Sequence, residues 1–88
     1  MNNYINFDTP TDNGIIGSAF YSNGYGASVT KVLSNDPITY NLGFLKQYDY
    51  HTWSCEIDTK LETISLESEV YNLTEEQLDE YLTQIKTL

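Results

Sequence analysis

The C-terminal end of the chain carries the strongest structural signal in the sequence. Thr74 and Gln77 form the capping-box pair that opens a helix, and Glu75 and Glu76 follow in the first turn, where the helix dipole favours negative charge. Apolar side chains then recur at helical spacing in Leu78, Tyr81, Leu82, Ile85 and Leu88. This pattern predicts an amphipathic helix. Its apolar stripe constrains the rest of the chain, which must supply a surface to cover it.

Period-two runs upstream predict that this surface is an antiparallel sheet. Residues 18–22 and 25–33 read as two strands joined at Asn23-Gly24, a pair typical of a type I′ turn in which both central residues have positive φ. After a turn at residues 34–37, which ends in Pro37, the segment 38–48 places four large residues on one face. These residues are Ile38, Tyr40, Leu42 and Phe44.

A fourth run follows at residues 53–58, after a loop over residues 49–52. Its alternation predicts Trp53, Cys55 and Ile57 inward, with Glu56 and Asp58 outward. Residues 59–72 fit either a short strand or a loop with one helical turn. Residues 1–17 alternate weakly; we expect either a loose N-terminal segment or a short edge strand over residues 4–8.

Together these elements predict a single small α+β domain over residues 1–88. We expect a four- or five-stranded antiparallel meander with the one C-terminal helix packed on one of its faces.

Charge and composition exclude several classes of protein. The 88 residues include 13 Asp and Glu against 4 Lys and no Arg, for a formal net charge of -9. Direct nucleic-acid binding requires a basic patch that four scattered Lys residues cannot form. No apolar run approaches the roughly 20 residues of a membrane span. The first residues lack the regions of a signal peptide, and the single Cys55 fits a reducing compartment, so we expect a cytoplasmic protein, or one in the host-cell cytoplasm if a phage encodes it.

Candidate catalytic and metal-ligating residues are few. His51 and Cys55 are the only residues of their types, and we place His51 in a loop and Cys55 on an apolar strand face as a small core residue. Asp49 with His51 is too small a set of ligands for a metal site, and no nucleophile-elbow motif occurs. We therefore expect no enzyme activity, no cofactor and no bound metal.

The acidity is concentrated in the last third of the chain. Residues 1–55 carry four Asp and two Lys, a net charge of -2, whereas residues 56–88 carry nine acidic residues and two Lys, a net charge of -7. This charge either keeps the protein soluble or forms an anionic face that attracts a basic partner. Tyrosine is common at protein contacts, and two of the eight tyrosines lie in or beside the predicted loop. The candidate partner-binding residues are Glu67, Glu69, Glu75, Glu76, Asp79, Glu80, Tyr48 and Tyr50.

The sequence thus favours a non-catalytic inhibitor that engages a basic protein, most simply one that normally holds nucleic acid. In size, charge and lack of catalytic motifs, the chain resembles the small acidic inhibitors that phages and mobile elements direct against nucleic-acid-binding defence proteins. This resemblance is one of composition and includes no aligned residue. Two alternatives stay open: an acidic immunity protein that neutralises a basic toxin, and a phage or accessory structural protein that self-associates through a sheet edge and its tyrosines.

Overall fold

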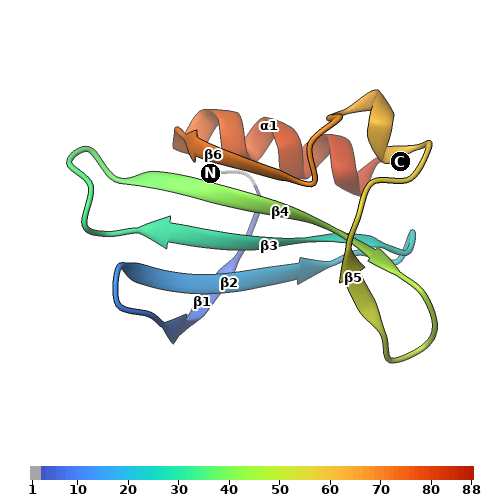
Figure 1. Cartoon of the computed structure of the whole chain (residues 1–88), viewed down its shortest axis with the longest axis horizontal. Coiled ribbons are helices and arrows are strands. Elements are labelled where there is room, and N and C mark those ends of the chain that lie inside the picture. Colours follow the sequence, from blue (N-terminus) through green and yellow to red (C-terminus); the bar gives the residue numbers. More distant parts are fainter. Residues whose placement is uncertain (1–2) are drawn as a thin grey trace.

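A computed structural model describes residues 3–88 as an antiparallel sheet and one α-helix (Figure 1). The predicted α+β fold class is confirmed, and the sheet has six strands among the described residues instead of four or five. The elements in chain order are β1 Asn6–Pro10, β2 Gly14–Phe20, β3 Tyr25–Val32, β4 Thr39–Gln47, β5 Trp53–Cys55, the 3-10 helix η1 Leu61–Thr63, β6 Glu69–Leu73 and the α-helix α1 Glu75–Lys86.

The first five strands form the predicted meander, and the sixth returns to β4. One edge of β4 pairs with β3, and the other edge is shared by two short strands. β5 pairs with the last residues of β4, for example Cys55 with Leu45. β6 pairs with an earlier part of β4, for example Val70 with Leu42. The ambiguous segment 59–72 therefore holds both of the structures considered for it, one helical turn in η1 and most of a strand in β6.

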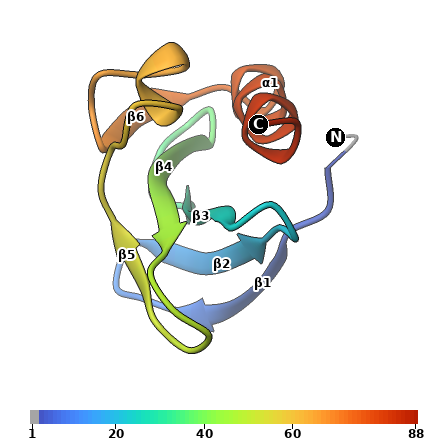
Figure 2. The same cartoon turned by 90° about the vertical axis from the view of Figure 1, so that its right-hand side faces the viewer.

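Helix α1 covers one face of β3 and β4, as the apolar stripe predicts (Figure 2). Leu78, Leu82 and Ile85 have no exposed surface, and Thr74 opens the helix with the complete capping box. These three apolar side chains of α1 pack on the face of β4 where Tyr40, Leu42 and Phe44 are buried. Ile38 precedes the strand and remains 42% exposed, so it does not extend that face.

The turn between β2 and β3 lies at the predicted position but has a different geometry. Of the two central residues of this turn, Gly24 has positive φ, at 86°, and Asn23 does not, so the turn is not of type I′. Tyr21 N–H donates to the Tyr25 carbonyl at 2.9 Å, which leaves a three-residue loop over residues 22–24 that suits a left-handed glycine in its third position. The side chain of Asn23 is held on both sides, accepting from Tyr25 N–H and donating to the end of α1.

The N-terminal part of the described chain belongs to the sheet. We considered a loose segment or an edge strand for residues 1–17, of which residues 1 and 2 lie outside the described residues. Residues 3–17 contain β1 and the start of β2. Asn3 is 6% exposed, and β1 is the edge strand, with a register shift between Phe7 and Thr9. Sequence reasoning placed β2 four residues too late, at residue 18, because Gly14 and Gly17 weaken its alternation.

The prediction that Trp53 and Cys55 point into the core is wrong. β5 pairs Cys55 with Leu45 and Trp53 with Gln47, and these β4 residues lie on the face opposite Phe44. Cys55 is exposed. The expectation that Asp58 points outward also fails, because its side chain is only 18% exposed and is bonded on several sides.

Candidate functional site

The two residues considered for nucleophilic chemistry have separate surroundings. His51 lies exposed in the loop between β4 and β5, with its ring edge-on to Tyr50 at 4.7 Å between centroids. The Cys55 thiol donates to the Ser68 carbonyl at 3.5 Å. Across residues 3–88, no group of three or more His, Cys, Asp and Glu side chains is placed to hold a metal ion. In that same range, no helix has the length and apolar character to cross a membrane.

The four acidic candidates on α1 differ in their environment. Glu75, Glu76 and Glu80 are exposed on the helix. Asp79 is half-buried, and its Oδ1 accepts hydrogen bonds from Asn3 N–H at 2.9 Å and from Asn3 Nδ2 at 2.7 Å. Asp79 therefore fastens the start of the described chain to the helix, in addition to any role at a binding surface.

Of the two acidic candidates before and in β6, Glu69 lies apart from the helix carboxylates. Glu67 is exposed in the loop that precedes β6. Glu69 lies opposite Gly43 in the β4–β6 register, on the sheet face away from α1. The hydroxyl of Tyr71 donates to the Glu69 carboxylate, which raises the pKa of Tyr71. The predicted acidic set is thus divided between two sides of the sheet.

The two tyrosine candidates lie at the β4–β5 loop. Tyr48 donates its hydroxyl to Glu56 Oε2 at 2.6 Å, and this bond is the main cause of the raised pKa of Tyr48. Tyr50 is 85% exposed. The structure therefore gives Tyr48 an intramolecular partner through its hydroxyl and leaves most of Tyr50 in contact with solvent.

Sequence reasoning missed a surface on the sheet face away from α1, which we call the open face. Phe20 is 58% exposed there, and its ring packs against Trp53 at 4.7 Å between centroids. Trp53 reaches over β3 because Gly26 has no side chain: a Cβ at Gly26 would lie 3.3 Å from the Trp53 ring. The open face comprises Phe20, Ser28, Thr30, Asn41, Leu45, Trp53, Cys55, Glu69 and Tyr71.

A pocket of about 330 Å³ lies in the middle of the open face. Gly43 lines it, and a Cβ built there would meet Cys55 Sγ at 3.5 Å and Glu69 Cγ at 4.0 Å. The pocket exists because β5 and β6 flank a glycine of β4 with larger side chains. Its volume is at the lower end of the range found for ligand sites.

The thiol of Cys55 in this pocket is protonated at neutral pH. Partial burial and the negative charge of Glu69 raise the pKa of Cys55, and they outweigh the hydrogen bonds that lower it. A protonated thiol is a weak nucleophile, so the pocket presents a soft, neutral sulfur wall next to one carboxylate.

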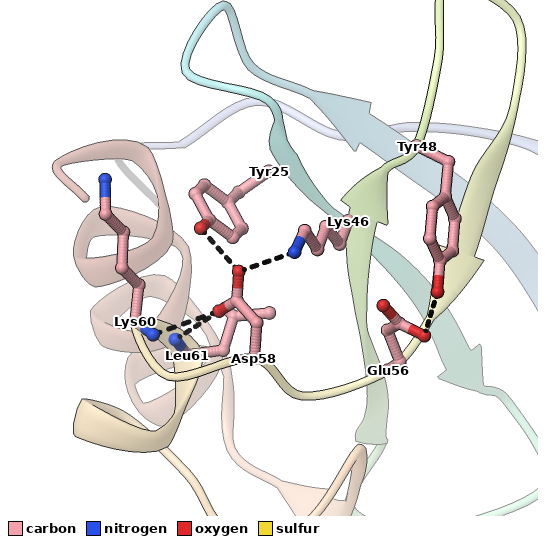
Figure 3. A network of polar contacts seen from close by, with 7 residues as sticks. All are labelled: Tyr25, Lys46, Tyr48, Glu56, Asp58, Lys60 and Leu61. Carbon is pink, nitrogen blue, oxygen red and sulfur yellow. Dashed lines mark hydrogen bonds and ion pairs between the residues drawn. The ribbon is translucent and has the colours of Figure 1, made fainter.

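A second polar cluster fixes the connection that leads from β5 to β6. Asp58 accepts from Tyr25 Oη at 2.7 Å and pairs with Lys46 Nζ at 3.1 Å (Figure 3). Its other oxygen accepts from the backbone N–H groups of Lys60 and Leu61. Asp58 thereby ties β3, β4 and η1 together, on the α1 side of the sheet. This cluster is structural. It supports the connection that leads into β6, the strand that begins with Glu69.

Comparison of the chain with family models, with curated proteins and with solved structures gives no match.

Proposed function

We propose that this protein is a non-catalytic binding protein whose open face docks on a basic protein. The observation that carries the proposal is the aromatic content of a sheet face that α1 does not cover. Phe20 and Tyr71 are each 58% exposed there, and Trp53 is half-buried beside Phe20. Aromatic residues are enriched at the centre of protein interfaces, where they provide most of the binding energy.

The charge of the chain determines the kind of partner. A formal net charge of -9 repels acidic proteins and attracts basic ones, and Glu69 brings one carboxylate into the open face itself. The exposed carboxylates of α1 lie on the other side of the sheet. In this proposal they accelerate association through the long-range field, and the open face supplies the contact.

We extend the proposal to a partner whose basic surface normally holds nucleic acid, in the reducing cytoplasm where Cys55 remains a thiol. A surface that attracts phosphates also attracts carboxylates, so the protein acts as an inhibitor by occupying that surface. Competition between the protein and nucleic acid for the captured partner tests this extension directly.

The experiment is capture of partners on the tagged protein at low and high salt, with two matched double variants. One variant changes the open face, Phe20→Ala with Tyr71→Ala, and the other changes only helix charge, Glu76→Gln with Glu80→Gln. We expect the wild type to capture a basic protein and the open-face variant to lose it. The helix variant should still capture it, with a lower rate of association. Circular dichroism and urea unfolding check that both variants fold.

Two results contradict the proposal. An open-face variant that is folded and captures the partner as well as the wild type places the interface elsewhere. Recovery of the bait alone, with a concentration-dependent dimer in ultracentrifugation, favours self-association. The register shift in β1 and Pro10 at its end already work against pairing through that edge.

A further inference from the structure

We infer that the pocket at Gly43 receives an arginine side chain of the basic partner. This inference rests on the proposed function and makes it specific, since it assigns the chemical group that enters the open face.

The electrostatic character of the pocket selects a cation. Its nine lining residues include one carboxylate, Glu69, and no lysine. The Tyr71 hydroxyl donates to the Glu69 carboxylate and thereby restricts its orientation. A carboxylate held in this way is prepared for a charge-assisted hydrogen bond, which is stronger than one between neutral groups.

The distribution of acceptors favours a guanidinium over an ammonium group. Ser28 and Thr30 add hydroxyl oxygens on β3, and Asn41 adds an amide oxygen on β4. The Asn41 oxygen already accepts from Asn72 N–H at 3.1 Å and retains a second lone pair. Five N–H donors in a planar fork can reach acceptors on several sides of the pocket, whereas an ammonium group acts as a compact point charge.

The apolar walls suit the rest of an arginine side chain. Leu45 and the neutral Cys55 line one part of the pocket, where the aliphatic stem can pack. Tyr71 is exposed, and its ring offers a face on which the guanidinium plane can stack.

The experiment is an NMR titration of the isotope-labelled full chain with arginine amide, and in parallel with lysine amide. We expect saturable shifts at the backbone amides of Gly43, Cys55 and Glu69. Glu69→Gln has nearly the same shape without the charge, and we expect it to lower the affinity for arginine amide by about tenfold. Glu62→Gln removes an equal charge at an exposed position of η1, outside the open face, and should leave the affinity unchanged.

A second variant narrows the pocket without changing charge. A methyl group at residue 43 would make only ordinary contacts, 3.5 Å or more from its neighbours, so Gly43→Ala should fold and should weaken the binding of arginine amide. Shifts confined to α1, or lysine amide binding as tightly as arginine amide, would overturn the inference. If arginine amide binds here while the open-face variant still captures its partner, the pocket binds a guanidinium group, but the proposed function fails, and with it the assignment of that group to the partner.

Discussion

The side-chain amide of Asn23, in the turn between β2 and β3, donates to the backbone carbonyl of Ile85 at 2.9 Å, across 62 positions of sequence. The same nitrogen lies 3.3 Å from the carbonyl oxygens of Lys86 and Leu88. The last carbonyls of a helix have no partner within the helix. A hairpin turn of the sheet therefore caps the C-terminus of the helix that covers it.

We predict that Asn23→Asp destabilises the protein by about 1–2 kcal/mol. The variant keeps the oxygen that accepts from Tyr25 N–H but loses the donor, and it adds a negative charge at the negative end of the helix dipole. Urea unfolding followed by circular dichroism measures the change. Asn35→Asp is the control, because Asn35 is exposed and donates to the nearby Thr39 hydroxyl, away from the end of α1. Equal stability of the two variants would contradict the capping role.

The Asn3–Asp79 contact predicts that two neighbouring helix carboxylates differ in their effect on folding. Asp79→Ala removes the acceptor of two hydrogen bonds from the buried Asn3, so we expect it to lower the free energy of unfolding by about 1.5–3 kcal/mol. Glu76→Ala, on the exposed part of the same helix, should change it by less than about 0.5 kcal/mol. Denaturant midpoints of the two variants give the comparison. An Asp79→Ala midpoint no lower than that of Glu76→Ala would remove the structural role.

The Asp58 cluster predicts an acid-sensitive contribution to stability. Partial burial raises the pKa of Asp58, but hydrogen bonds from Leu61 N–H and Tyr25 and the ion pair with Lys46 outweigh it and lower the pKa from 3.8 to about 2. Because the folded value is the lower one, the stabilisation is complete well above pH 3.8 and disappears as the pH falls toward 2. It amounts to roughly 2 kcal/mol.

Urea unfolding of the wild type and of Asp58→Asn as a function of pH tests this point. We expect the wild type to be the more stable protein at neutral pH, and the difference to shrink as the pH approaches 2. A difference that stays constant over this range would show that Asp58 contributes through its shape and hydrogen bonds and not through its charge.

The elements with local signals were predictable. The capping box at Thr74 and the helical spacing of Leu78, Leu82 and Ile85 are encoded within one segment, and all three leucine and isoleucine side chains are buried. The alternation in β4 was equally clear, because a strand with one buried face repeats every two residues.

The features that depend on distant segments were not predictable. β5 has three residues, so its alternation did not show which face was inward; its pairing with Leu45 and Gln47 of β4 decides that. The candidate site also depends on segments that are distant in the sequence. Glu69 stood out by charge alone, whereas the pocket beside it requires that β5 and β6 share one edge of β4 around Gly43. The Asn3 contact likewise joins Asp79 to a residue 76 positions away.

Two glycines on the open face predict opposite outcomes for the same substitution. A Cβ at Gly26 would lie 2.3 Å from the Ala19 carbonyl oxygen, so Gly26→Ala should force β2 and β3 apart and cost about 1–3 kcal/mol. Gly43→Ala has room for its methyl group and should change stability by less than about 1 kcal/mol. Trp53 fluorescence should change with Gly26→Ala, because the ring lies against that residue. Similar unfolding midpoints for the two variants would contradict the close approach of β2 to Gly26.

The single cysteine reports on the electrostatics of the pocket. Burial is the main cause that raises the pKa of Cys55 above 9.0, and the charge of Glu69 is the second. We therefore expect slow alkylation by iodoacetamide at neutral pH, with a rate that rises along a titration curve centred above 9.0. Glu69→Gln should lower this midpoint, and Glu76→Gln should not move it. If Glu69→Gln leaves the midpoint unchanged, the carboxylate does not act on the sulfur. The Glu69 side chain would then not lie beside Cys55 in solution.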